Sequence, residues 1–354
     1  MAASLLANSR QMVEESITSP EHLDGVAYLY GHPLLNSLSP PLHQTIYNNL
    51  GLNWAQVSLS VSDISSLTYP PPYTLSPPIE KFLASTRSNP KFVGSSVTMP
   101  WKVSIMPHLD DLTEEARQIG ACNTIYLRKE NGRRVFVGTN TDCVGIRESL
   151  LQNSLTGSLD NDSYRNKPAM IIGGGGTARA AIYTLRRWLG CNKIYIVNRD
   201  RSEVETILAE DASRSYNGSK SEIIYISELD GIDELESPAA IVSGIPNYPP
   251  KTAEEIKTRK IIQAMLGSPL PGGKLKGVLL EMCYHPLPWT DISELAKQAG
   301  WKVIGGSEAL IWQGLEQAKL WTGRDIIAQP GLVEQVKDVV AKEMERRARQ
   351  SAKL

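Results

Sequence analysis

The sequence predicts an α/β protein with two domains. The chain has 354 residues, which is the length of about two domains. Short apolar runs that stop at glycine or at a polar turn, as expected of buried strands, recur along it. A polar stretch at residues 153–167 divides these runs into two series. We expect a first α/β domain over residues 1–145, a second over 146–306, and C-terminal helices over 307–354 that pack back on the first.

In the first series, apolar and aromatic runs predict strands at residues 26–30, 54–61 and 91–98. A helix is expected at about 113–119. Residues 123–128 and 134–138 predict a hairpin, because the Asn131-Gly132 pair between them favours the positive φ angles of a tight turn.

The second series begins with a strand–helix–strand unit. Strands are predicted at residues 169–172 and 193–197, with a helix between them that ends near Leu189. Further apolar runs at residues 239–242 and 277–282 are expected to continue a parallel sheet. Polar insertions at 211–222 and 267–276 predict surface loops, and the chain after Gly305 predicts helices with an amphipathic tail at 332–349.

The bulk composition excludes several classes of protein. A net charge of -1 gives no electrostatic basis for binding nucleic acid or an anionic membrane. The 4 cysteines are scattered and predict reduced thiols, and the 5 histidines do not cluster with them, so we expect no metal site. The N-terminus lacks a long apolar run, which indicates a cytoplasmic protein. The terminal Ala352-Lys-Leu354 resembles a peroxisomal address, or is an ordinary helix end.

A glycine-rich loop follows the strand at 169–172 and opens the next helix. Gly173, Gly175 and Ala178 fit the G-x-G-x-x-G/A pattern, which turns the chain tightly and lets a pyrophosphate approach the backbone at a helix N-terminus. Gly176 and Thr177 lie at the same turn. The pattern predicts a dinucleotide site, and the alternative is a purely structural turn.

The next strand ends in Asn198-Arg199-Asp200, where the adenosine ribose of a dinucleotide is bound in such folds. A carboxylate there hydrogen-bonds a free 2′-hydroxyl, whereas an arginine favours a 2′-phosphate. Asp200 favours NAD, although Arg199 leaves NADP open; the alternative is a solvated charge cluster.

A lone lysine and a lone aspartate stand in otherwise uncharged stretches. Lys102 ends SVTMPWK, and Asp142 ends GTNTD. Alcohol oxidation by a dinucleotide needs a group that takes the hydroxyl proton, and a buried lysine suits this task because burial disfavours its charged form. From spacing alone, a buried structural ion pair or two unrelated surface residues explain them better than a catalytic pair does.

The chain resembles the shikimate/quinate dehydrogenase family over nearly its whole length. The matching blocks are residues 31–43 (GHPLLNSLSPPLH), 94–102 (GSSVTMPWK), 119–124 (IGACNT), 138–145 (GTNTDCVG), the glycine loop, 281–290 (EMCYHPLPWT) and 305–313 (GGSEALIWQ). The resemblance implies a substrate-binding first domain and a Rossmann second domain. It also implies that Lys102 and Asp142 are the catalytic pair.

The resemblance implies roles for further residues. Ser37 and Ser39 would hold a substrate carboxylate, Thr98, Asn123 and Gln313 would bind ring hydroxyls, and Tyr284 would lie near the carboxylate. Gly305 would belong to the cofactor site. Such a set makes chemical sense, since a polyhydroxy acid requires many neutral hydrogen-bond partners. The substrate would be quinate or shikimate, and the protein a monomer or homodimer.

Within the family, the chain resembles the free-standing fungal quinate dehydrogenases in its length, its glycine loop, the Asn-Arg-Asp end of the strand and the Trp312-Gln-Gly run. Asp200 replaces the threonine of a phosphate-binding Asn-Arg-Thr, which favours NAD. Asn36, Gln44, Ser96 and Glu281 also differ from the common residues, and none of them is in the catalytic pair. The alternatives are a biosynthetic NADP-dependent shikimate dehydrogenase, a non-catalytic sensor of the same ligands and, more remotely, a folate dehydrogenase.

Overall fold

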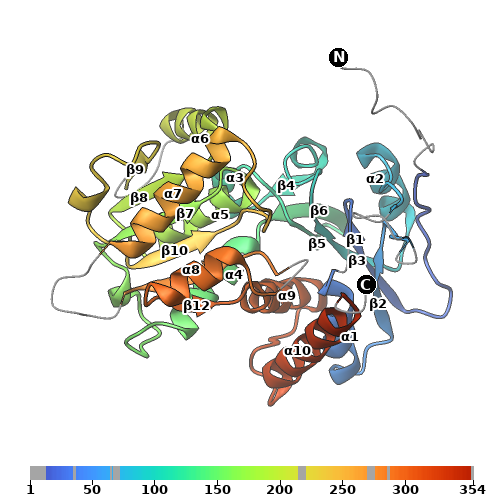
Figure 1. The fold of residues 1–354 in the computed structure, drawn as a ribbon. Helices are drawn as coiled ribbons and strands as arrows, with labels where there is room; N and C mark the ends of the chain where they lie inside the picture. Colours follow the sequence, from blue (N-terminus) through green and yellow to red (C-terminus); the bar gives the residue numbers. More distant parts are fainter. Residues whose placement is uncertain are drawn as a thin grey trace. The chain divides into compact units, whose positions relative to one another are not determined.

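The computed structural model describes residues 13–34, 37–63, 66, 72–213, 221–268, 276–284 and 288–351. Two sheets with flanking helices confirm the predicted α/β class (Figure 1). The chain divides into two compact units. The first comprises Met1–Thr113, Cys122–Thr139 and Gln317–Val336, and the second Glu114–Ala121, Asn140–Glu316 and Lys337–Leu354. The assignment of substrate and cofactor to separate domains stays a prediction.

The first unit is built on a mixed sheet of order β2-β1-β3-β5-β6-β4. Strands β1, β2 and β3 are parallel, and β5 runs antiparallel to both β3 and β6. The predicted hairpin is present, with Asn131 and Gly132 at φ 49 and 78. The strands are β1 Gly25–Tyr30, β2 Trp54–Ser58, β3 Phe92–Val97, β4 Asp111–Leu112, β5 Thr124–Glu130 and β6 Arg133–Thr139.

Helices cover both faces of this sheet. On one face, Phe82 of α2 (Ile79–Ser88) packs with Tyr28 and Tyr30 of β1, and the Phe82 and Tyr30 ring centroids are 4.0 Å apart. On the other, Tyr47 of α1 (Ser39–Asn49) and Trp321 of α9 (Gly306–Thr322) form a second cluster. The C-terminal part of α9, from Gln317, therefore belongs to the first unit, whereas residues 306–316 and 337–354 belong to the second. A short η1 turn, Met106–His108, lies between β3 and β4.

The second unit contains a parallel sheet of order β12-β11-β10-β7-β8-β9. The chain starts in the middle at β7, moves outward through β8 and β9, then crosses to β10 and continues to β12. This is the doubly wound order in which ligands bind beyond the carboxyl ends of β7 and β10. The strands are β7 Pro168–Ile172, β8 Lys193–Val197, β9 Glu222–Tyr225, β10 Ala240–Ser243, β11 Val278–Glu281 and β12 Lys302–Ile304.

Alternate side chains of these strands enter two separate apolar clusters, because successive residues of a strand point to opposite faces. Ala169 and Ile171 face one cluster, and Met170 and Ile172 face the other. The first is covered by α4 Asp142–Gln152, α5 Gly176–Tyr183 and α6 Arg201–Ser213, and the second by α7 Ala253–Gly267 and α8 Asp291–Gln298. The remaining elements are α3 Glu114–Ile119, η2 Asn161–Ser163, η3 Thr184–Trp188, η4 Ile232–Glu234 and α10 Leu332–Ser351.

The structure departs from the sequence predictions in several places. The helix predicted to run to Leu189 is α-helical only to Tyr183 and continues as a π-helical turn, η3. Part of the predicted loop at 211–222 belongs to α6. Asn36, and most of the predicted loop at 267–276, lie outside the described residues, as do the terminal residues 352–354.

In the described part of the chain, no helix is long and apolar enough to cross a membrane. All 4 cysteines are free thiols.

Candidate active site

Several predicted substrate residues lie at one edge of the sheet in the first unit. Because β1 and β3 are parallel neighbours, the loops after them leave from the same edge. Thr98 follows β3, and its N–H donates to the Tyr30 carbonyl over 2.8 Å. Asn123 precedes the antiparallel β5, and its carbonyl accepts from Val97 N–H over 2.6 Å. The sheet therefore brings Thr98 and Asn123 to one place.

Ser37 and Ser39 belong to the loop between β1 and α1. The Ser37 hydroxyl accepts from the Ser39 N–H over 3.3 Å, and the Ser39 hydroxyl donates to Gln56 Oε1 of β2 over 2.8 Å. A serine followed by proline is a common start of a helix, with the serine as the cap, but Ser39 does not cap α1. Ser39 is the first residue of α1, and the helix has no side-chain cap, because the hydroxyl bonds to the neighbouring strand instead.

A buried network of neutral side chains connects Ser39 to Asn123. Gln56, which accepts from Ser39, donates from its own side-chain amide to Ser96 Oγ over 2.9 Å. The Ser96 hydroxyl then donates to Gln317 Oε1 of α9, also over 2.9 Å. Gln317 Nε2 then donates to Thr124 Oγ1 over 2.9 Å, and Thr124 donates to Asn123 Oδ1 over 2.8 Å. We call this chain of hydrogen-bonded residues the polar network; its members are Ser39, Gln56, Ser96, Gln317, Thr124 and Asn123.

His43 of α1 forms a hydrogen bond with one member of the polar network, Gln317. Its Nε2 lies 3.1 Å from Gln317 Oε1, which makes this nitrogen the donor. Burial lowers the pKa of His43 to about 4, against the opposing effect of the Gln317 hydrogen bond, so the imidazole is neutral at physiological pH. No motif in the sequence predicts Gln56 or Gln317, although Gln317 lies one helical turn beyond the predicted site residue Gln313.

Lys102 is half-buried in the turn after β3. Its carbonyl accepts from Cys122 N–H over 2.7 Å, which ties this turn to the segment before β5. The preceding Trp101 stacks on Tyr30 at 5.8 Å between ring centroids and donates from Nε1 to Ser76 over 2.7 Å. The main chain at Lys102 is therefore held from two sides at the same edge as Thr98 and Asn123.

Asp142 is buried at the start of α4 in the second unit. Its N–H donates to Asn140 Oδ1 over 3.0 Å, and the Asn140 amide donates to the Ala121 carbonyl over 2.9 Å. A carboxylate in the first turn of a helix is favoured by the helix dipole. One turn later, Gly145 lies against α9, where an added Cβ would come within 3.3 Å of Gln313 Cβ. The structure thus brings the beginning of α4 close to Gln313.

The glycine loop lies between β7 and α5, at the switch point of the second sheet. Gly173 has φ +124, which strongly favours glycine, and Gly175 precedes a helix that no side chain caps. Among the described residues, none has an atom within 4 Å of a Cβ atom added at Gly175 or Gly176. Ala178 is buried, as expected of the small third residue. An open, uncapped helix N-terminus is a suitable site for a pyrophosphate, so these residues fit a dinucleotide.

The loop after β10 also lies at this switch point, which the sequence analysis did not foresee. A Cβ at Gly173 would lie 3.2 Å from the Ile245 side chain, and one at Gly244 would lie 3.1 Å from Thr177 Cγ2. The signal in the sequence was the Ser243-Gly244 pair at the end of a predicted strand. Gly305 follows β12, with β11 and β10 between that strand and β7.

The three residues after β8 make different contacts. Asn198 is buried, and its amide donates to the Asp200 carbonyl and to Glu203 over 2.9 and 2.8 Å. Asp200 Oδ1 accepts from the Ser202 hydroxyl and N–H, and these bonds hold the pKa of Asp200 below its usual value. Arg199 forms an ion pair with Glu255 of α7.

A buried carboxylate, Glu281, ends β11 close to the predicted ligand residue Tyr284. Its Oε2 accepts from the hydroxyls of Ser243 and Thr290 over 3.1 and 2.8 Å, and its Oε1 accepts from Cys283 N–H over 3.0 Å. Burial raises the pKa of Glu281 to about 7, although these hydrogen bonds oppose the rise. Glu281 therefore ties the ends of two strands to the start of α8.

The raised pKa of Glu281 predicts a dependence of stability on pH. The folded chain keeps the Glu281 proton up to about pH 7, whereas the unfolded chain releases it near 4.5. Stability should therefore fall as pH rises through this window, by on the order of 3 kcal/mol, and level off above it. Glu281→Gln should lack this decline, and the exposed control Glu236→Gln should keep it. Urea unfolding between pH 4.5 and 8 measures both, and a Glu281→Gln curve parallel to wild type would contradict the assignment.

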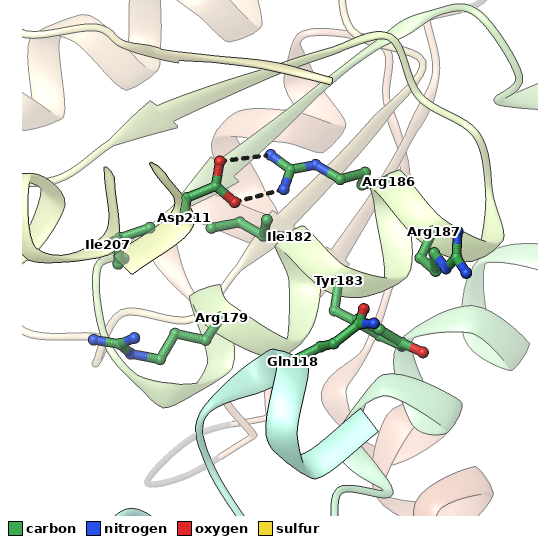
Figure 2. A pocket seen from close by; sticks show the side chains of 8 residues that line it. All are labelled: Gln118, Arg179, Ile182, Tyr183, Arg186, Arg187, Ile207 and Asp211. Atoms are coloured by element: carbon green, nitrogen blue, oxygen red, sulfur yellow. Dashed lines mark hydrogen bonds and ion pairs between the residues drawn. The ribbon is translucent and has the colours of Figure 1, made fainter. Parts of the chain in front are cut away.

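A separate hollow in the second unit lies over α5, η3 and α6. Figure 2 shows Arg186 pointing at Asp211, with the Nη1 and Oδ1 atoms 2.5 Å apart. Arg179 of α5 is paired with Glu210 of α6, the helix that also carries Asp211. None of the predicted site residues lines this hollow, and two of its arginines are engaged by carboxylates. The lining residues are Gln118, Arg179, Ile182, Tyr183, Arg186, Arg187, Ile207 and Asp211.

Comparison with known proteins agrees with the resemblance seen in the sequence. Residues 29–125 match the shikimate dehydrogenase substrate binding domain family. A quinate dehydrogenase of Emericella nidulans is 61% identical over 336 residues, which cover 95% of this chain and 99% of that protein.

Two solved structures share the fold. The dehydroquinate dehydratase and shikimate dehydrogenase of S. pombe AroM superposes with a TM-score of 0.66 at 32% identity, over 88% of this chain and 53% of that one. A shikimate dehydrogenase in complex with NADP+ superposes with a TM-score of 0.64 at 26% identity, over 90% of this chain and 96% of that one. The chain therefore belongs to the shikimate/quinate dehydrogenase family.

Proposed function

We propose that this protein is a quinate dehydrogenase that oxidises a ring hydroxyl of quinate to the ketone of 3-dehydroquinate, with NAD as its cofactor. The observation that carries the proposal is the 61% identity, over nearly the full length of both chains, to a protein named quinate dehydrogenase. Shikimate, which lacks the tertiary hydroxyl of quinate, is the expected second substrate.

Lys102 is the proposed base. A dinucleotide held by the second unit would supply the acceptor for the hydride of the carbinol carbon. The hydroxyl on that carbon must lose its proton, and the Lys102 amine takes it. Asp142 is proposed to bind the same hydroxyl and to orient the lysine. The turn that carries Lys102 is anchored through Cys122 and Trp101, which supports a fixed position for the base.

The first unit is proposed to bind the substrate. Thr98 and Asn123 share one sheet edge, and Asn123 is oriented by Thr124 at the end of the polar network. Gln313 and Tyr284 are proposed to add contacts to the ring and the carboxylate. Ser39 donates its proton to Gln56, so binding a carboxylate requires this hydroxyl to turn or Ser37 to act as the donor.

The second unit is proposed to bind the dinucleotide. Gly173, Gly175 and Gly176, with Thr177 and Ala178, would hold the pyrophosphate at the N-terminus of α5. Asn198, Arg199 and Asp200 would surround the adenosine ribose, and Gly305 would lie nearer the nicotinamide. The choice of NAD rests on the exposed Asp200 carboxylate, which a 2′-phosphate would have to approach.

A second candidate is an NADP-dependent shikimate dehydrogenase. Its support is the likeness to the shikimate dehydrogenase in complex with NADP+, at 26% identity. Arg199 is the residue in this chain that would favour the 2′-phosphate.

A cytoplasmic location, peroxisomal import through residues 352–354 and a monomeric or homodimeric state all stay predictions.

Initial rates with the purified protein test the proposal. Quinate and shikimate are each offered with NAD+ and with NADP+, and a preparation from host cells that lack the protein corrects for background dehydrogenases. We expect quinate with NAD+ to give the highest kcat/KM. A preference for shikimate with NADP+ would support the second candidate instead. Ligand binding without turnover in any of the four pairs would support a sensor and contradict the enzyme.

A further inference from the structure

Arg199 is engaged by a carboxylate from a distant part of the sequence. Its Nη1 donates to Glu255 Oε1, and these two residues are 56 positions apart. The arginine side chain is 64% exposed, whereas that of Glu255 is only 21% exposed. Arg199, the proposed attractor of a 2′-phosphate, thus has an anionic partner at the end of β8.

Glu255 is held in place by its own helix. It is the third residue of α7 and forms a capping box with Thr252, whose side chain accepts from the Glu255 N–H. Its Oε2 accepts from the N–H groups of Lys251 and Thr252 over 2.7 and 3.1 Å. These backbone bonds hold the pKa of Glu255 below its usual value, so it stays ionised. Its position does not depend on the ion pair.

The other charged side chains near the end of β8 do not neutralise the negative charge of Glu255. Asp200 is exposed at the same turn, and Glu203 bonds to Asn198. Arg201, the next arginine in the chain, is paired with Glu205 over 2.8 Å. A dianionic 2′-phosphate entering here would have to displace Glu255 from Arg199 and approach Asp200. A neutral ribose hydroxyl meets neither obstacle.

We propose that Glu255 is a specificity-determining residue that excludes 2′-phosphorylated dinucleotides by occupying Arg199 and adding a fixed negative charge beside it. This inference rests on the proposed function, because it assumes that a dinucleotide binds at the end of β8. It extends that function by assigning the selection against NADP to a residue on α7.

Binding of nicotinamide-free fragments tests the proposal without turnover. ADP-ribose and its 2′-phosphate are titrated into wild-type protein and Glu255→Gln by calorimetry. Glutamine can keep the capping box, so α7 should stay folded, which circular dichroism and thermal melting verify. We expect Glu255→Gln to raise the affinity for the phosphorylated fragment, relative to the unphosphorylated one, about tenfold. Glu254→Gln, the same charge change at the adjacent position, is the matched control and should leave this ratio within about twofold.

A double variant tests whether Arg199 is the group responsible for the gain in affinity for the phosphorylated fragment. Adding Arg199→Ala to Glu255→Gln should abolish the gain, because Arg199 is the cation that the substitution releases. An unchanged ratio in Glu255→Gln, or an equal change in Glu254→Gln, would overturn the inference while leaving the proposed function intact. Failure of wild-type protein to bind either fragment would overturn both.

Discussion

Replacing Lys102 with alanine is expected to lower kcat for quinate oxidation about 10²- to 10⁴-fold, which is the range that general-base catalysis contributes. The hydroxyl proton then has no acceptor at the position where the lysine amine stood. Because the turn is held by main-chain and Trp101 contacts, the variant should fold normally. Steady-state rates together with calorimetric binding of quinate separate a loss of chemistry from a loss of binding.

Chemical rescue distinguishes a base from a structural residue. A small alkylamine such as ethylamine should restore part of the Lys102→Ala activity, with a dependence on amine concentration that saturates. Lys81→Ala is the matched control, since Lys81 is an exposed lysine of the same unit that pairs with Glu14. That variant should keep wild-type kcat and show no response to amine. A Lys102→Ala enzyme with more than about a tenth of wild-type kcat would be incompatible with the assignment.

Breaking the buried Arg186–Asp211 pair should give the largest loss of stability among the changes considered. Their side chains are 4% and 10% exposed, and Arg186 Nη2 also donates to the Ser221 carbonyl over 3.3 Å. Arg186→Met leaves the Asp211 carboxylate buried without its cation. We expect the free energy of unfolding to fall by about 3–5 kcal/mol, measured by urea titration.

The double variant Arg186→Met/Asp211→Leu tests the cause of this loss. It removes both charges, so it should be markedly more stable than Arg186→Met alone. Lys342→Met breaks the exposed pair with Asp338 in the same unit and should cost no more than about 1 kcal/mol. If Arg186→Met cost as little as this control, the buried pair would not be a main source of stability.

Local patterns were sufficient to predict many elements of the fold. The strand expected at 193–197 is β8, and the Asn131-Gly132 hairpin joins β5 to β6. Both signals are contained in a few adjacent residues. The two-residue β4 and the three-residue β12 carry no comparable pattern, since strands this short exist only through pairing with a neighbour.

In the candidate site too, features encoded by adjacent residues were predictable, and contacts between distant residues were not. The glycine loop between β7 and α5 was foreseeable because one short motif contains both the tight turn and the helix start. The partner of Ser39 was not, because Gln56 reaches it only through the pairing of β1 with β2. Gln317 and Thr124 are 193 positions apart, so no local pattern relates them. The π-helical turn at Thr184 interrupts a stretch whose composition suits an uninterrupted helix.

The composition of the polar network bears on the pH dependence of the enzyme. Every link from Ser39 to Asn123 joins hydroxyl and amide groups, which neither gain nor lose protons in the physiological range. His43, the one titratable side chain bonded to Gln317 in the described structure, stays neutral well below pH 6. The hydrogen bonds from Ser39 to Asn123 therefore add no titrating group to the proposed binding of the ring. A pH dependence of turnover would therefore point to ionisable groups outside the polar network.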